Sequence, residues 1–230
     1  MIGKAASILR GLLQVIVLLP ILAALLFIPA GRLDWVMAWI LLGVYLAGLF
    51  VTSLLAALID PELARERRKA PQGAKSWDKL LIHLSNLLFF LVMLPLSGLD
   101  KRFGWSPQVH LAVQIIALVG FVLGYGLVGW AMASNRFFSA IVRIQDNRGH
   151  VVASGGPYRY VRHPGYVGMI TMLLVAPLVL GSLWALLPAG LAALLYVVRT
   201  AMEDKTLHEE LAGYAEYARR VRYRLLPGVW

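Results

Sequence analysis

Cysteine is absent from this chain of 230 residues, and charged residues are scarce. Without cysteine the chain can form no disulfide, no thiolate metal site and no catalytic thiol. Charged residues make up 15% of the sequence and hydrophobic residues 60%, whereas soluble domains contain about 25% charged residues. Such a composition indicates a protein that lies in a lipid bilayer.

Acidic residues are the scarcer of the two charged kinds. The sequence holds 12 Asp and Glu against 22 Lys and Arg, which gives a formal net charge of +10. The basic residues stand in short blocks between apolar runs, as they do in the cytoplasmic loops of membrane proteins. A nucleic-acid partner is therefore not expected.

Six apolar segments can be marked, at roughly 9–30, 33–59, 80–98, 109–134, 165–182 and 184–199. The first four can span a hydrocarbon core of about 30 Å. The last two are shorter and are joined by Gly181-Ser182, which predicts a tight helical hairpin that need not fully span. We expect an all-α polytopic membrane protein with a four-helix transmembrane scaffold (1–134) and a functional core (135–230).

The basic residues also predict an orientation. If the N-terminus is cytoplasmic, the segments 1–10, 60–79, 135–164 and 199–230 lie inside and contain 19 of the 22 Lys and Arg residues. By the positive-inside rule, both termini and the segments 135–164 and 199–230 face the cytoplasm of an inner or plasma membrane.

Two segments outside the apolar runs have patterns of their own. In 139–153, apolar stretches flank the turn residues Asp146-Asn147-Arg148-Gly149, which predicts a short extended hairpin at the surface. In the tail, apolar residues recur at spacings of four and three, which predicts one amphipathic cytoplasmic helix. Its apolar face would consist of Leu207, Leu211, Tyr214, Ala218 and Val221.

The most informative stretch is 155–166, which is polar, aromatic and rigid although an apolar run follows it. Such residues are costly at the entrance of a membrane helix unless they serve a purpose. Pro164 would start the next helix, whose N-terminus attracts anions. Arg162 could hold a second anion with a two-pronged hydrogen bond, although anchoring to the inner leaflet is a plainer alternative. Glu203, four residues after Arg199, could reach the same pocket and bind a cation.

Two other patterns can be compared with known dinucleotide-binding and metal sites. The letters Gly124-Tyr125-Gly126-Leu127-Val128-Gly129 fit a dinucleotide-binding motif, but they lie inside an apolar run where helical amides are already bonded. Small residues at this spacing favour close packing of helices instead. The five histidines show no metal-ligand spacing, so no metal site is expected.

An ordered set of motifs covers residues 135–230: Gly156-Pro157-Tyr158, then Arg162-His163-Pro164-x-Tyr166, then Arg199-x-x-x-Glu203-Asp204, then Gly213-Tyr214-x-x-Tyr217 and finally Pro227. This set resembles the isoprenylcysteine carboxyl methyltransferase family, whose C-terminal core is similar to that of phospholipid methyltransferases. The sequence departs from the family at Asp204, where a second glutamate is usual.

The resemblance implies S-adenosyl-L-methionine as cofactor and a lipidic methyl acceptor, with the carboxylate of an isoprenylcysteine-like or other isoprenoid substrate favoured. It implies catalytic roles for Arg162 and Glu203, and acceptor binding by Arg162 and Arg199. The implied cofactor pocket consists of Gly156, Pro157, Tyr158, His163, Pro164, Tyr166, Glu203, Tyr214 and Tyr217.

Methyl transfer to a carboxylate suits these residues, because it needs alignment and exclusion of water but no metal and no strong base. Transfer to a phospholipid amine would need a proton acceptor, for which His163 or Glu203 is available. A sterol-type NADPH-dependent reductase is a further alternative, since those enzymes have a similar Arg-His-Pro region. A non-catalytic membrane subunit is the last.

Overall fold

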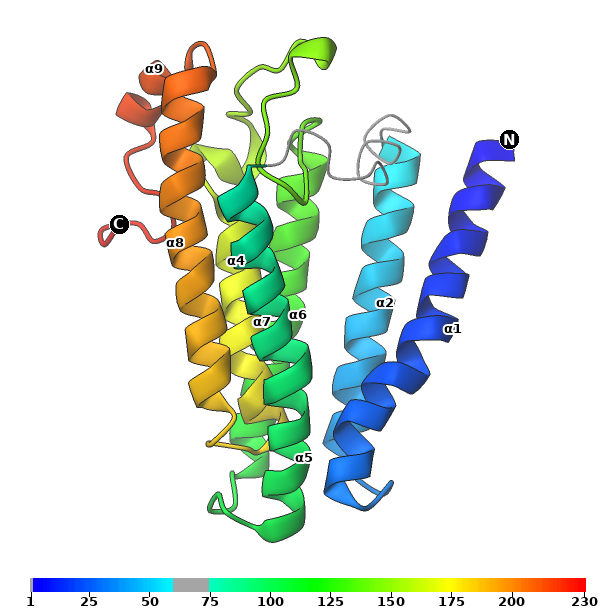
Figure 1. Cartoon of the computed structure of the whole chain (residues 1–230). Coiled ribbons are helices and arrows are strands. Elements are labelled where there is room, and N and C mark those ends of the chain that lie inside the picture. The colour runs from blue at the N-terminus through cyan, green and yellow to red at the C-terminus, as the bar shows by residue number, and fades with distance from the viewer. Residues whose placement is uncertain (1, 60–74) are drawn as a thin grey trace.

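The apolar runs of the sequence form helices that lie side by side in a bundle (Figure 1). The computed structural model describes residues 2–59 and 75–230, and all regular secondary structure within these residues is helical. The expectation of an all-α fold is therefore confirmed. The helices are α1 (Ile2–Ala30), α2 (Val36–Ile59), α4 (Ser76–Asn86), α5 (Leu94–Phe103), α6 (Leu111–Ala133), α7 (Pro164–Leu180), α8 (Leu186–Glu210) and α9 (Tyr214–Arg220).

Three shorter helical elements complete the secondary structure of the described residues. The π-helical turn η1 (Leu87–Met93) joins α4 to α5, so that residues 76–103 form one continuous helix. The two 3₁₀ turns η2 (Asp146–Arg148) and η3 (Gly156–Arg159) lie in the long connection between α6 and α7.

Five helices of the described residues are long and apolar enough to cross a membrane: Gly11–Ala30, Val36–Leu55, Ser76–Phe103, Leu111–Ala133 and Leu186–Glu210. The chain is thus a polytopic membrane protein. The last apolar segment belongs to a helix longer than its apolar run, because the charged residues after 199 continue the same helix and α8 has 25 residues. The other member of the predicted hairpin, α7, is short, with 17 residues.

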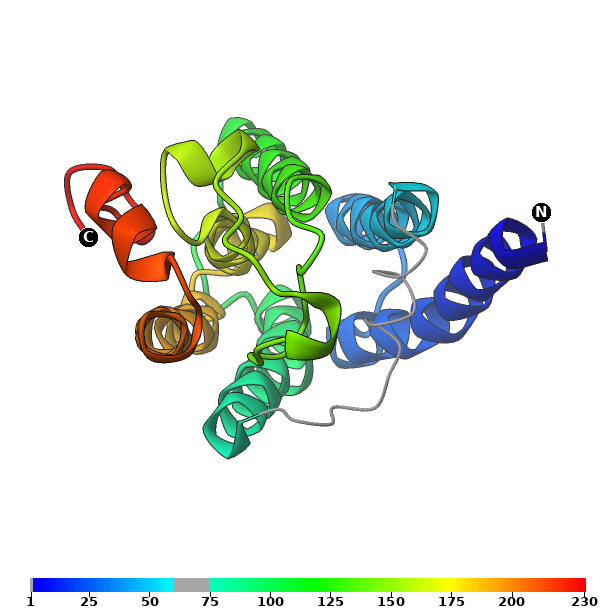
Figure 2. The same ribbon diagram turned by 90° about the horizontal axis from the view of Figure 1, so that it is seen from above.

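The short α7 packs against both α6 and α8 (Figure 2). Its contact with α6 is close because two glycines face each other. A Cβ atom added at Gly168 would lie 2.5 Å from the carbonyl oxygen of Gly124. Small residues let membrane helices approach in this way. Gly124 therefore serves helix packing, as expected for an apolar helical run.

The largest apolar cluster draws on both halves of the chain. Its most deeply buried members include Leu26 of α1, Met93 of η1, Phe121 of α6 and Val179 of α7. The N-terminal helices therefore pack directly on the C-terminal ones. A division into a scaffold of 1–134 and a core of 135–230 stays a prediction.

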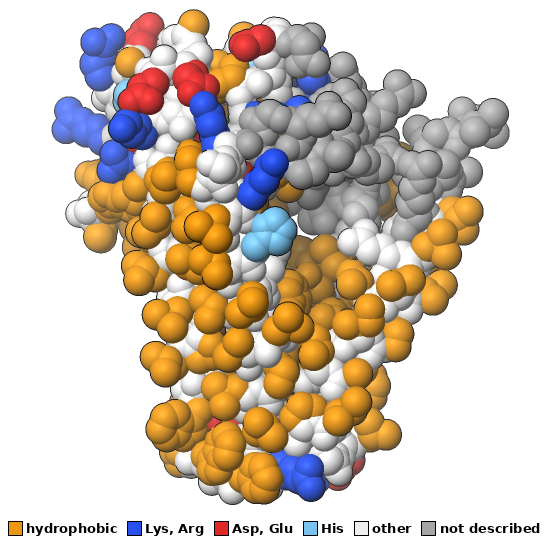
Figure 3. All heavy atoms as spheres, in the orientation of Figure 1, with side chains coloured by type: hydrophobic (Ala, Val, Ile, Leu, Met, Phe, Trp, Pro, Cys, Tyr) orange, Lys and Arg blue, Asp and Glu red, His pale blue; other side chains and the backbone are white. Residues whose placement is uncertain are grey.

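One end of the bundle carries most of the polar structure, and we call it the polar end. The start of α1, the connection between α6 and α7, and α9 all lie there (Figure 1), where charged side chains gather above apolar flanks (Figure 3). Part of the predicted charge pattern, residues 60–74 and the side chains of Lys4 and Arg10, lies outside the described residues. Which end faces the cytoplasm stays a prediction.

The tail differs from the single amphipathic helix that the sequence predicted. The break between α8 and α9 occurs at Gly213, whose φ of 81° costs glycine little. The apolar residues of the tail nevertheless meet in one cluster, together with Tyr158. That cluster includes all five of the predicted face, Leu207, Leu211, Tyr214, Ala218 and Val221.

The segment 139–153 contains the predicted turn, as η2 followed by Gly149 with a φ of 61°. Its flanks do not pair as strands, so the expectation of a hairpin was wrong. Side chains hold the segment instead: Nε2 of Gln145 donates to the carbonyl of Phe137 at 2.8 Å, and Oγ of Ser139 accepts from the amide of Ile141 at 3.2 Å.

Candidate functional site: a cavity at the polar end

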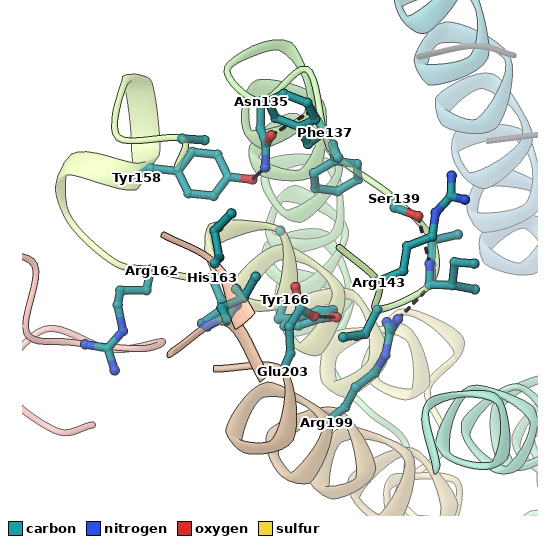
Figure 4. Close-up of a pocket in the computed structure, with 18 of the residues that line it drawn as sticks. Asn135, Phe137, Ser139, Arg143, Tyr158, Arg162, His163, Tyr166, Arg199 and Glu203 are labelled. Carbon is teal, nitrogen blue, oxygen red and sulfur yellow. Dashed lines mark hydrogen bonds between the residues drawn. The ribbon is translucent and has the colours of Figure 1, made fainter. Parts of the chain in front are cut away.

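A tight turn at Gly156 builds the wall next to α6. Gly156 has a φ of 55°, and a Cβ atom there would lie 2.2 Å from Oγ of Ser134, so that only glycine fits. The turn buries Pro157 and directs the ring of Tyr158 toward Asn135 (Figure 4). Nδ2 of Asn135 donates to the hydroxyl of Tyr158 at 3.3 Å.

The Arg-His-Pro turn is held by the chain that follows α9. The amide of Arg162 donates to the carbonyl of Tyr223 at 2.9 Å, and the amide of His163 donates to that of Arg224 at 3.0 Å. Pro164 then begins α7, as predicted for a proline in a first turn. The turn and the C-terminal segment 221–230 are therefore fixed side by side.

Asp204 is the centre of the polar network at this end. Its carboxylate is buried and accepts from Nε and Nη2 of Arg162 at 2.7 and 3.0 Å, from Nε of Arg224 at 2.8 Å and from the hydroxyl of Tyr214 at 2.8 Å. Nε2 of His163 lies 3.2 Å from the same carboxylate. Burial and the charge of Asp204 raise the pKa of Tyr214, which therefore stays a donor. Sequence analysis had noted Asp204 only as a departure from the family.

This network changes the interpretation of Arg162. Besides the two bonds to Asp204, Nη1 of Arg162 donates to the carbonyls of Val221 at 2.9 Å and Arg222 at 2.7 Å. Burial lowers the pKa of Arg162, but the hydrogen bond and charge of Asp204 raise it above its ordinary value, so the guanidinium stays charged. It points away from Glu203 (Figure 4). Four of its five N–H groups are thus engaged, which favours positioning of the C-terminal segment over the predicted binding of an acceptor.

A cavity of about 300 Å³ lies between the 135–153 connection, α7, α8 and α9. The Arg-His-Pro turn and the tail thus border one hollow, as the sequence predicted. Three predicted site residues, Gly156, Pro157 and Pro164, do not line it and instead shape the turns beside it. The predicted residues that do line it are Tyr158, Arg162, His163, Tyr166, Arg199, Glu203, Tyr214 and Tyr217.

Glu203 brings a carboxylate from α8 to the cavity wall. The hydroxyl of Tyr166 donates a hydrogen bond to Oε2 of Glu203. The ring of Tyr166 lies nearly parallel to the imidazole of His163, with centroids 5.8 Å apart. Because Tyr166 is buried, this contact holds the carboxylate in one place. A fixed carboxylate beside aromatic faces can bind a cation.

Arg199 brings a buried cation to the same cavity. Its Nε donates to Oδ1 of Asp78 in α4 at 2.6 Å, and its Nη2 donates to the carbonyl of Ala140 at 2.8 Å. The guanidinium lies over the ring of Tyr166, 5.0 Å from the centroid. Nη1 of Arg162 donates to two carbonyls, whereas Nη1 of Arg199 makes no hydrogen bond within the described residues. The Arg199 guanidinium therefore keeps donors for an anionic ligand.

The connection after α6 supplies a wall that sequence analysis missed. Asn135, Phe137, Phe138 and Ser139 line the cavity, as does His150, whose ring lies 4.5 Å from that of Phe137. Burial lowers the pKa of His150, which favours its neutral form. Two adjacent phenylalanines, flanked by the polar residues Asn135-Arg136 and Ser139, were the available signal.

Fold and cavity together define a class: an integral membrane protein with a polar and aromatic small-molecule pocket at one end of its helical bundle. Comparison with known families narrows this class. Residues 115–209 match the model of the isoprenylcysteine carboxyl methyltransferase family. The match supports the resemblance that the motifs indicated for this part of the chain.

A curated relative points the same way. The chain is 29% identical over 163 residues to the protein-S-isoprenylcysteine O-methyltransferase of Schizosaccharomyces pombe. The alignment covers 63% of this chain and 66% of the relative, just under two thirds of the relative's length. The family match includes Arg162, Glu203 and Asp204, whereas Tyr214 lies beyond its end and Asp78 before its start.

Proposed function

We propose that this protein transfers a methyl group from S-adenosylmethionine to the carboxylate of an isoprenylcysteine-like or other isoprenoid acceptor. One observation carries the proposal: the Arg-His-Pro turn, the polar end of α8 and the start of α9 line a single cavity at one end of a membrane bundle. The family match and the name of the relative support the same chemistry.

The residues of the cavity fit S-adenosylmethionine. Its sulfonium and ammonium groups are cations, for which the carboxylate of Glu203 and tyrosine faces are suitable partners. Its adenine is flat and can pack on aromatic rings such as those of Phe137 and Tyr158. Burial raises the pKa of Tyr158 and of Tyr217, so that both hydroxyls stay protonated. In this proposal the cofactor is held by Tyr158, His163, Tyr166, Glu203, Tyr214 and Tyr217.

The acceptor site follows from Arg199 and its apolar neighbours. The donors of Arg199 that the described chain does not use suit a carboxylate. Ile82 of α4, Met169 of α7 and Leu207 of α8 line the same cavity. An acceptor with an anionic head and an apolar tail matches both features.

When bound, S-adenosylmethionine supplies a methyl group made electrophilic by the sulfonium. A carboxylate is already ionised and nucleophilic at neutral pH, so no side chain has to remove a proton. Arg199 orients the acceptor, Glu203 balances positive charge, and the turn with α9 excludes water. In this proposal Arg162 acts indirectly, because it holds the wall through Asp204.

A phospholipid amine is a less suitable acceptor, since its methylation requires a proton acceptor. Nε2 of His163 is within 3.2 Å of Asp204 and within 3.3 Å of the Tyr214 hydroxyl, so it is already engaged. Among the described residues no group of three or more His, Asp or Glu side chains is arranged to hold a metal. A metal-independent transfer of a methyl group to a carboxylate at the cytoplasmic face stays our proposal.

Calorimetric titration of the purified protein with S-adenosylhomocysteine and with NADPH tests the cofactor. We expect binding of the first and none of the second; binding of NADPH alone would support a reductase, and binding of neither would support a non-catalytic subunit. The acceptor is tested with methyl-labelled S-adenosylmethionine and N-acetyl-S-farnesylcysteine, followed by a screen of lipid extracts. Label released as methanol by alkali identifies a methyl ester, whereas alkali-stable label identifies an amine product.

A further inference from the structure

Asp78 is a buried carboxylate of α4 that does not itself line the cavity but contacts Arg199 and Val142, which do. It is fully buried and lies in the first turn of α4, before the start of the family match. Its Oδ1 accepts from Nε of Arg199 at 2.6 Å, and its Oδ2 accepts from the amide of Val142 at 2.7 Å. One side chain of the N-terminal helices therefore contacts both α8 and the connection after α6.

These contacts fix the direction of the Arg199 guanidinium. Asp78 holds the Nε side, and the carbonyl of Ala140 holds Nη2 at 2.8 Å. The rings of Tyr166 and Tyr196 lie 5.0 and 5.8 Å from the guanidinium carbon. A planar guanidinium held in this way has one orientation, and the hydrogen bonds of the described residues leave both N–H groups of Nη1 for a ligand.

A second buried carboxylate shows what a purely structural role looks like. Asp100 accepts from the amide and hydroxyl of Ser106 and from the hydroxyl of Ser182. All of these donors are neutral and belong to loops at the opposite end of the bundle. Asp78, by contrast, pairs with a cation that lines the proposed acceptor site.

We infer that Asp78 is a positioning residue that orients Arg199 toward the carboxylate of the methyl acceptor. This inference rests on the proposed function. It makes α4 part of the active site through its first turn, in addition to Ile82 and Asn86, which line the cavity. An asparagine at this position keeps the size and one acceptor oxygen but removes the charge that holds Arg199.

The test compares two compounds that compete for the acceptor site of the same protein. They are N-acetyl-S-farnesylcysteine and its carboxamide, which lacks the negative charge. The readout is the ratio of their inhibition constants, which does not depend on the fraction of folded protein. We expect Asp78→Asn to lower the preference for the carboxylate about tenfold, the usual contribution of a well-placed charged hydrogen bond. S-adenosylhomocysteine should bind with an unchanged dissociation constant.

Asp100→Asn is the matched control, because it removes an equally buried carboxylate far from the cavity; its ratio should equal that of the wild type. An unchanged ratio in Asp78→Asn overturns the inference. If that variant does not bind S-adenosylhomocysteine, Asp78→Glu is the deciding variant. We expect its preference for the carboxylate to fall about threefold, because the charge is displaced. An unchanged ratio of inhibition constants in this variant would overturn the inference. Failure of the wild type to bind S-adenosylhomocysteine would instead refute the proposed function.

Discussion

The two ends of the bundle satisfy their buried carboxylates in different ways. At the opposite end, the donors to Asp100 among the described residues are the neutral groups of Ser106 and Ser182. At the polar end, Asp204 accepts from Arg162 and Arg224, both of them cations. Neutral donors connect loops at little electrostatic cost, whereas buried charges are expensive and need complete pairing.

This difference concerns buried charge, because the ion pair of Arg32 with Asp34 at the opposite end is exposed. The polar end combines cations, carboxylates and aromatic rings around a cavity, which is an arrangement that binds a charged ligand. At the opposite end, hydrogen bonds from two serines to one aspartate hold the loops together. Variants of matched chemistry at the two ends can therefore separate ligand binding from folding.

The largest effect is expected from Asp204→Asn, which leaves Arg162 and Arg224 without a counter-charge. Breaking a buried ion pair costs about 3–5 kcal/mol, so we expect S-adenosylhomocysteine to bind more than about 100-fold more weakly. Calorimetric titration measures this change. Asp100→Asn should leave the dissociation constant within about twofold of the wild type, and an equal loss in both variants would contradict the contrast between the ends.

Glu203→Gln should have the next largest effect, because it removes the carboxylate held by Tyr166 while keeping its shape. We expect about tenfold weaker binding of S-adenosylmethionine, the loss of one charged interaction. Glu209→Gln is the control, since Glu209 is an exposed member of the same helix. Unchanged binding in Glu203→Gln would remove this residue from the cofactor site.

At the opposite end, Ser182→Ala removes one of the hydrogen bonds to Asp100. We expect thermal unfolding in detergent to show a loss of about 1–3 kcal/mol, as for a buried acceptor deprived of a partner. Cofactor affinity should not change. A variant that loses affinity but not stability would show that this end also belongs to the site.

The smallest effect concerns pH. Burial lowers the pKa of His150, while Asp146 raises it and Arg148 lowers it. The folded state therefore binds its proton less readily than the unfolded chain, and stability falls as the pH drops below the ordinary histidine value of about 6.5. We expect the melting temperature to fall less steeply between about pH 7 and pH 5 in His150→Asn than in the wild type. Equal slopes would contradict a role for His150.

Helix positions and the location of the site could be predicted from the sequence because both depend on local patterns. The apolar runs predicted the helices. The Arg-His-Pro turn and the Arg199–Glu203 spacing predicted much of the cavity wall. The full length of α8 was missed because its polar half continues the helix beyond the apolar run. The break at Gly213 was missed because the apolar spacing continues across it.

The contacts between distant segments could not be predicted. No local pattern relates Asp78 to Arg199, which lie 121 positions apart, or the Arg-His-Pro turn to Tyr223. The contacts of Arg162 could not be predicted either, because its partner Asp204 and the carbonyls of Val221 and Arg222 come together only in the folded chain.

The pairing of the Arg-His-Pro turn with residues 223 and 224 has a consequence for synthesis. A ribosome makes α1 to α8 before it makes these residues, so the pocket lacks one wall until the tail has been synthesised. Until Arg224 emerges, Asp204 has one fewer cation, and the turn lacks its backbone partners. The wall that faces α8 is therefore completed only when residues 223 and 224 pair with the Arg-His-Pro turn.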